Sequence, residues 1–136
     1  MGAEAMSELK LLLVDDEQAF LEPMAARLAR RRISCSTAQS GEEALKLLAK
    51  ERFSCAIVDV MMPVMDGLEL LRRIRRDYPK TAVILLTGHA SVELGVQGME
   101  LGAFEYLMKP VDLDELLDTV RRAAVETALI PERSNA

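Results

Sequence analysis

The sequence predicts an α/β fold in which five parallel strands form one sheet with helices on both faces. Short apolar runs alternate with longer amphipathic stretches in five strand–helix units along the 136 residues, and this alternation is typical of a parallel sheet covered by helices. The first, third and fourth runs are almost wholly apolar, as buried central strands are. The predicted strand order is therefore 2-1-3-4-5, a common doubly wound arrangement that leaves the two more polar strands at the edges.

The strands are predicted at residues 9–14, 33–38, 53–59, 82–87 and 104–109. Each is a short run rich in apolar residues and bounded by polar residues, as strands are. The second contains Ser34, Ser36 and Thr37, and the fifth contains Glu105. These polar residues are the reason for placing both strands at the edges.

The helices are predicted where apolar residues recur every three or four positions, as Phe20, Leu21, Met24 and Leu28 do. Their ranges are 17–31, 40–50, 66–77, 91–101 and 112–128. Capping boxes mark three helix starts, namely Ser40 with Glu43, Asp66 with Glu69 and Asp112 with Glu115. We expect one domain over residues 9–128, with residues 1–8 and 129–136 as disordered extensions.

Composition limits the classes of function. Half of the residues are apolar and 29% are charged, which is ordinary for a globular protein. The net charge of −5 argues against a surface for nucleic acid or for an anionic membrane, and the apolar runs are too short to span a bilayer. Cys35 and Cys55 are predicted to be free thiols on strands that the first strand separates, so we expect a reducing, cytoplasmic location.

Acidic residues close two central strands of the predicted sheet. Asp15 and Asp16 follow the first strand, and Asp59 ends the third. In such sheets ligands bind beyond the carboxyl ends of the strands, where the strand order reverses, and this point lies between the first and third strands. A lone Asp16 would more often cap the following helix. Three carboxylates together repel one another unless a cation compensates, and an all-oxygen set suits Mg²⁺.

Two further strand ends supply a hydroxyl and an ammonium group. Thr87 closes the fourth strand and Lys109 closes the fifth. Each alone would be an ordinary strand residue, but together they face the acidic cluster and could hold phosphoryl oxygens. Asp59 is then the candidate nucleophile, because a carboxylate can form an acyl phosphate.

Four segments resemble the receiver domains of bacterial two-component response regulators. They are LLLVDDE at 11–17, IVDVMMPVMDGLEL at 57–70, VILLTGHA at 83–90 and GAFEYLMKP at 102–110. Their order and spacing are those of this family, which includes the chemotaxis regulators, and the similarity extends from about residue 9 to about residue 125. The resemblance implies a flavodoxin-like (βα)5 sandwich.

The resemblance also implies the ligands of a metal ion. Asp59 would be the phosphoacceptor and a ligand, Asp16 a direct ligand, and Asp15 a ligand through water. The backbone carbonyl of Met61 would be a third protein ligand. The ion would be Mg²⁺, with Mn²⁺ as a substitute.

The switch residues follow from the same resemblance. Thr87 and Lys109 would contact the phosphoryl group, with a cis peptide between Lys109 and Pro110. Tyr106 would turn inward when Thr87 moves toward that group. His89, the sole histidine, is expected to be an exposed loop residue. Met61 and His89 resemble positions that tune hydrolysis of the acyl phosphate, so the lifetime of the phosphorylated state stays open.

The implied activity is self-modification, since the chain would catalyse its own aspartyl phosphorylation and dephosphorylation. The phosphoryl group would come from a phosphohistidine of a sensor histidine kinase or histidine phosphotransfer protein, or from a small phosphodonor. The output would be a changed surface at residues 91–101, 104–109 and 112–128. A downstream protein or effector domain would read this surface. A second copy of the chain could also bind it, in a phosphorylation-dependent homodimer.

Three alternatives stay open at this point. The chain could be the receiver of a longer DNA-binding regulator or hybrid histidine kinase. It could be a scaffold that resembles a receiver, which the intact acids, Thr87 and Lys109 argue against. It could be a haloacid-dehalogenase-type phosphatase, but that class needs an Asp-x-Asp motif, and Asp15-Asp16-Glu17 does not supply one.

Overall fold

The computed structural model describes residues 9–89 and 91–128. Five parallel strands form one sheet in the order β2-β1-β3-β4-β5, which confirms the predicted topology. The strands are β1 (Lys10–Val14), β2 (Ser34–Ala38), β3 (Cys55–Val58), β4 (Ala82–Thr87) and β5 (Glu105–Met108). The helices are α2 (Gln18–Arg30), α3 (Gly41–Lys50), α4 (Gly67–Asp77), α5 (Val92–Glu100) and α6 (Leu113–Ala128). The extensions expected at 1–8 and 129–136 lie outside the described residues.

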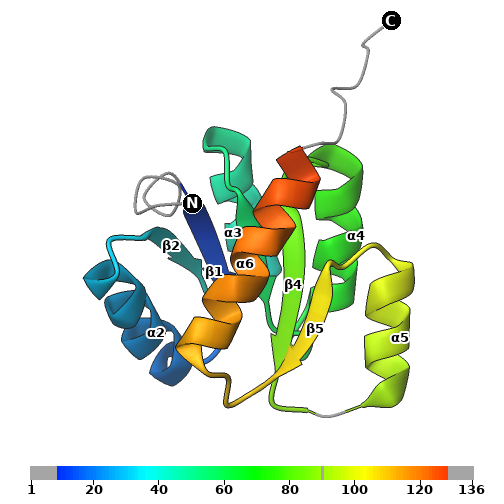
Figure 1. Ribbon diagram of the computed structural model, residues 1–136. Helices are drawn as coiled ribbons and strands as arrows, with labels where there is room; N and C mark the ends of the chain where they lie inside the picture. The colour runs from blue at the N-terminus through cyan, green and yellow to red at the C-terminus, as the bar shows by residue number, and fades with distance from the viewer. Residues whose placement is uncertain (1–8, 90, 129–136) are drawn as a thin grey trace, which may run out of the picture.

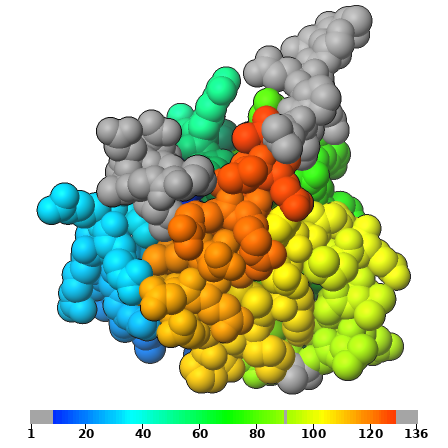
Figure 2. Space-filling view, in the orientation of Figure 1, coloured from blue at the N-terminus to red at the C-terminus, as the bar shows by residue number. Residues whose placement is uncertain are grey.

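The helices cover both faces of the sheet (Figure 1). Leu11 and Leu13 of β1 belong to a core cluster with α2 and α6, whereas Leu12 and Val14 belong to a second cluster with α3 and α4. This division follows from the alternation of side chains along a strand. In the space-filling view, α6 covers the middle of the first face, with β5 and α5 to its right (Figure 2).

Side-chain caps fix the starts of four helices. Ser40, Asp66, Ser91 and Asp112 each accept a hydrogen bond from the backbone amide three residues later. Three of these caps confirm the predicted pairs, and each satisfies an amide that the helix itself leaves unpaired. The helix α2 differs, because its N-cap residue Glu17 makes no side-chain cap. Because Glu17 occupies the N-cap position, Asp16 lies one residue before the position from which it would cap α2.

The edge strands are the more exposed ones, as their composition predicts. All residues of β3 and β4 are buried, whereas β2 and β5 contain half-buried and exposed residues. The loops that leave β4 and β5 both lie at the lower edge of the sheet in Figure 1. The carboxyl ends of the parallel strands therefore share one edge, where the predicted site residues lie.

Cys35 and Cys55 are free thiols, and Leu11 of β1 pairs between them. Cys55 is buried, but Cys35 is only half-buried, because β2 is an edge strand. Burial raises the pKa of Cys35 to about 11 and that of Cys55 to about 12. Both thiols therefore stay protonated at neutral pH. Among the described helices, none is long and apolar enough to cross a membrane.

The arginine run on α4 is balanced by acids on the same helix. Arg72 and Arg73 both pair with Glu69, and Arg76 pairs with Asp77. This arrangement is that of a solvated helix face on which charges of both signs alternate.

Candidate functional site

Two buried aspartates lie at the carboxyl ends of β1 and β3. Asp15 is 1% exposed and Asp59 is 4% exposed. Their backbone amides continue the sheet ladder, with Asp15 donating to Ala38 and Asp59 donating to Val14. Because Val14 pairs with Val58, the next residue of each strand reaches the same edge. The predicted meeting of Asp15 and Asp59 is therefore present.

The third carboxylate of this cluster comes from Glu17. One oxygen from each of Asp15, Glu17 and Asp59 lies within 4.8 Å of the others. Asp16 is exposed, and its side chain is not part of this group among the described residues. Asp15 Oδ1 accepts the Glu17 amide at 2.9 Å, which turns the chain back toward the site. Sequence reasoning missed Glu17, and the Asp-Asp-Glu run was its only signal.

Lys109 provides the positive charge of the site. Its Nζ lies 2.5 Å from Asp15 Oδ2, 3.6 Å from Glu17 Oε1 and 3.7 Å from Asp59 Oδ2. Its side chain is only 15% exposed, and its backbone amide donates to the Thr87 carbonyl. The peptide between Lys109 and Pro110 is cis, as the resemblance implies. One ammonium thus faces three carboxylates.

The pKa values reflect this crowding. Burial and the charge of Asp15 raise the pKa of Asp59, and hydrogen bonding by Thr87, the charge of Lys109 and the Met61 amide offset them only in part. Burial alone would lower the pKa of Lys109, but its hydrogen bond to Asp15 and the surrounding carboxylates raise it. Lys109 is therefore charged at neutral pH.

Thr87 is fully buried at the end of β4. Its hydroxyl oxygen accepts the backbone amide of His89 at 3.2 Å, and its hydrogen bonding to Asp59 lowers the pKa of that carboxyl. His89 is exposed, as the sequence suggests. Thr87 therefore links the acidic cluster to the loop between β4 and α5.

The loop after β3 closes over Asp59. The Met61 amide donates to Asp59 Oδ1 at 3.3 Å, and the Met61 side chain is 48% exposed. Gly67, the first residue of α4, packs against the Asp59 backbone, where an added Cβ would lie 2.3 Å from the Asp59 carbonyl oxygen. Only glycine fits such an approach. Gly67 is a second residue that sequence reasoning left without a role.

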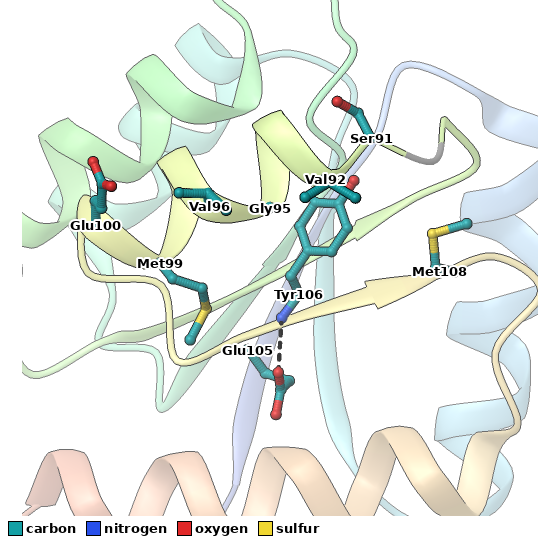
Figure 3. Close-up of a pocket in the computed structure, with 9 residues that line it drawn as sticks. All are labelled: Ser91, Val92, Gly95, Val96, Met99, Glu100, Glu105, Tyr106 and Met108. Carbon is teal, nitrogen blue, oxygen red and sulfur yellow. Dashed lines mark hydrogen bonds between the residues drawn. The ribbon is translucent and has the colours of Figure 1, made fainter.

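Tyr106 stands on β5 beside α5, with its phenol oxygen toward the start of that helix (Figure 3). The hydroxyl donates to the His89 carbonyl at 3.3 Å. A Cβ added at Gly95 would lie 3.4 Å from the Tyr106 ring. Tyr106 also lines a groove of about 580 Å³ between α5 and β5, with exposed apolar side chains at Val92, Val96, Met99 and Met108.

The donor set of the site fits a hard divalent cation. Three carboxylates within reach of one another offer oxygen ligands only, which Mg²⁺ prefers. Their three negative charges exceed the one charge of Lys109, so a cation would relieve the remaining repulsion.

Comparison with known proteins adds an independent finding. The family model for the response regulator receiver domain matches residues 11–121. The chain is 42% identical over 116 residues to the response regulator protein FleR of Pseudomonas aeruginosa. It is 37% identical over 111 residues to the DNA-binding transcriptional regulator NtrC of Escherichia coli. These matches cover 85% and 82% of this chain but 24% of each relative, so the chain spans about a quarter of their length.

Solved structures resemble the fold over nearly its whole length. A receiver domain protein from Clostridium thermocellum gives a TM-score of 0.83 at 33% identity, covering 89% of this chain and 98% of that one. A response regulator protein from Burkholderia pseudomallei, solved with a phosphorylated aspartic acid, a calcium ion and citrate, gives 0.80 at 31% identity, covering 89% and 71%. The sequence match and the shared architecture agree, and the chain belongs to the receiver-domain family of two-component response regulators.

Proposed function

We propose that the chain accepts a phosphoryl group on Asp59. The observation that carries this proposal is the burial of Asp59 beside Asp15 and Glu17, with Lys109 Nζ 3.7 Å away. A carboxylate oxygen of Asp59 attacks phosphorus, a new O–P bond forms, and the bond to the donor breaks. The leaving group is the imidazole of a kinase phosphohistidine, or acetate when acetyl phosphate is the donor.

Members of this family bind Mg²⁺ at an acidic pocket, and this chain has such a pocket. We assign its protein ligands to the carboxylates of Asp16 and Asp59 and the carbonyl of Met61, with Asp15 acting through water and Glu17 beside them. When bound, Mg²⁺ or Mn²⁺ neutralises charge on the oxygens of the transferred group. The metal ligands come from the resemblance; the carboxylate cluster supports Asp15 and Asp59, whereas Asp16 lies outside it.

Lys109 and Thr87 hold the transferred group. The Lys109 ammonium, now 2.5 Å from Asp15 Oδ2, shifts toward a phosphoryl oxygen on Asp59. The Thr87 hydroxyl transfers its donated hydrogen bond from the Asp59 carboxylate to another phosphoryl oxygen, and as it moves it leaves the His89 amide, whose hydrogen bond it now accepts. The His89 loop then moves, and Tyr106 loses its bond to the His89 carbonyl and turns inward. Attack of water on phosphorus later breaks the O–P bond to Asp59, releases inorganic phosphate and restores the Asp59 carboxylate.

Receiver domains act between histidine kinases and downstream effectors. We propose that this chain takes its phosphoryl group from a sensor kinase or histidine phosphotransfer protein in the cytoplasm. The altered surface comprises α5, β5 and α6, with residues 9–128 forming the domain. Two solved relatives support this cycle, namely the phosphorylated Burkholderia protein and a BeF3-activated DrrB receiver domain.

A second reading is that the chain is the receiver of a longer regulator. The match to a quarter of FleR and of NtrC favours it. Both readings share the chemistry at Asp59 and differ in the output. The neighbouring coding sequence and a phosphotransfer profile against candidate kinases distinguish them.

The experiment for Asp59 is phosphorylation from acetyl phosphate with Mg²⁺. Asp59→Asn removes the nucleophile at nearly constant shape, so we expect no phosphorylation and an unchanged circular dichroism spectrum. Asp66→Asn is the matched control, because Asp66 caps α4 outside the cluster. Asp59 should still be phosphorylated in this variant. An acid-labile, hydroxylamine-sensitive phosphate on the Asp59→Asn protein contradicts the assignment.

A further inference from the structure

The Lys109 ammonium has an aromatic neighbour as well as its carboxylates. Its Nζ lies 4.2 Å from the centroid of the Phe20 ring. The chain has three phenylalanines, and each has a cation over its ring. The other two pairs are Lys10 with Phe53 at 5.5 Å and Arg122 with Phe104 at 5.7 Å. The Phe20 pair is the shortest of the three and contains the lysine of the proposed site.

Phe20 is placed here by the start of α2 on one side and by the loop after β5 on the other. Phe20 lies in the first turn of α2, just after the acidic loop, and its amide donates to the Glu17 carbonyl at 3.0 Å. The ring packs partly buried against the core cluster of α2 and α6. It also lines the groove between α2 and the loop after β5, together with Lys109, Pro110 and Val111. The ring therefore lies directly beside Lys109, between the core and the loop after β5.

The contact has a physical consequence for Lys109. A lysine ammonium ends a flexible four-carbon chain, and three carboxylates compete for it here. The face of an aromatic ring attracts a cation within about 6 Å of its centroid. Unlike an acidic or amide side chain, the ring takes little of the ammonium's hydrogen-bonding capacity. The ammonium can therefore keep its contact with the ring while its hydrogen bond passes from Asp15 to a phosphoryl oxygen on Asp59.

We propose that Phe20 is a positioning residue for Lys109, which it holds beside Asp59 through the cation–π contact, and this role rests on the proposed function. Phe20 touches neither phosphodonor nor metal ligand oxygens in this role. It speeds phosphorylation by restricting where the Lys109 ammonium lies. The competing explanation is that Phe20 serves only to pack α2 against the core.

The decisive experiment changes the ring's charge distribution and leaves its size nearly constant. Mono-, di- and trifluorophenylalanine are placed at position 20, and initial rates of Asp59 phosphorylation from acetyl phosphate with Mg²⁺ are measured. Fluorine withdraws charge from the ring face, so the rate should fall stepwise, by about two- to fivefold in total, for a contact of this strength. The same series at Phe53 is the control, because its cation is Lys10 and not Lys109, and its rates should stay constant.

A second measurement needs no phosphodonor. In metal-free buffer, the Lys109 Cε protons should show a ring-current shift that Phe20→Leu abolishes. Phe20→Leu should slow phosphorylation when it is the only change in the chain. It should have no further effect in the Lys109→Met variant, where the contact is already lost. If the rate of Asp59 phosphorylation is normal and constant across the fluorinated Phe20 series, the positioning role is contradicted but the proposed function is not. Failure of the parent to phosphorylate Asp59 at all contradicts the proposed function, and the positioning role falls with it.

Discussion

Three successive acids leave β1 and reach different places. Asp15 is buried, accepts the Glu17 amide and pairs with Lys109. Glu17 is exposed, yet one of its oxygens joins the cluster with Asp15 and Asp59. Asp16 is exposed and outside that group. The same chemical group therefore has a different environment at each position, because the backbone turns after Asp15.

The metal response should separate the roles of Asp16 and Glu17. With Asp16 as a ligand, Asp16→Asn should weaken apparent Mg²⁺ affinity about tenfold or more, which corresponds to about 1.4 kcal/mol. Glu17→Gln should have a smaller effect. Thermal unfolding at increasing Mg²⁺ concentration measures both, because a ligand that binds the folded state raises its stability. Unchanged affinity in Asp16→Asn with a loss in Glu17→Gln would transfer the ligand role to Glu17.

Val64 occupies a strained position in the loop between β3 and α4. Its φ is 69°, and its side chain is fully exposed. A β-branched residue is rare in this left-handed region, whereas asparagine tolerates it. Val64→Asn should therefore raise the free energy of unfolding by about 0.5–1 kcal/mol in urea melts.

A matched valine distinguishes strain from exposure at Val64. Val92 is also highly exposed, at 86%, but lies in α5 and is not among the described residues of positive φ. Val92→Asn should give no gain in stability. An equal gain at both positions would show that removal of exposed apolar surface, not backbone strain, is the cause.

At the scale of elements, α5 differs from α6 in how firmly it is packed. Only Gly98 is buried in α5, whereas seven residues are buried in α6. A Cβ at Gly98 would lie 2.4 Å from a methyl group of Leu85, so this glycine permits close packing against β4. Gly95 and Gly98 each also cost about 1 kcal/mol of helix stability relative to alanine. Both effects belong to the helix that follows Thr87.

Hydrogen exchange should reveal this difference between the two helices. Amides of residues 92–101 should exchange much faster than those of 115–124 in the unphosphorylated protein, because little apolar surface holds α5 in place. Mg²⁺ with beryllofluoride, a phosphoryl mimic, should slow exchange in α5. Equal protection of both helices, unchanged by the mimic, would mean that the glycines serve only packing.

The elements could be predicted because their signals are local. Alternation of apolar residues and the caps at Ser40, Asp66 and Asp112 placed every strand and helix end within two residues. The contributions of Glu17 and Gly67 could not be predicted in the same way. The first depends on the turn after Asp15, and the second on how closely α4 approaches the Asp59 backbone. The turn is local but has no distinctive sequence pattern, and the close approach of α4 is a contact between segments whose relative placement no local pattern specifies.

At the scale of the whole molecule, the fold concentrates like charge at one edge of its sheet. The strand order brings β1 and β3 together, and Asp15 and Asp59 at their ends are almost completely buried. Buried carboxylates that face each other weaken the fold unless a proton or a cation compensates. The stability of the protein should therefore depend on pH and on Mg²⁺ through the same residues.

The last prediction concerns this linkage at Asp59. Its pKa is raised in the folded protein, so between the unfolded pKa of about 3.9 and the raised folded value the folded state binds more protons than the unfolded state. The stabilising contribution of this group is fully present below the unfolded pKa and is lost as pH rises through the folded pKa. Asp59→Asn cannot ionise, and in metal-free buffer it should be more stable than the parent at neutral pH.

That advantage should shrink as the pH falls through the raised folded pKa and should be smallest below about 4, where the parent carboxyl is protonated in both the folded and the unfolded state. Added Mg²⁺ should also reduce it at neutral pH, because the ion stabilises the parent more than a variant that lacks one of its proposed ligands. Urea melts across this pH range, with and without Mg²⁺, measure both effects, and Asp118→Asn on the exposed face of α6 is the control. A difference between Asp59→Asn and the parent that is independent of pH would show that repulsion at Asp59 does not limit the stability of this fold.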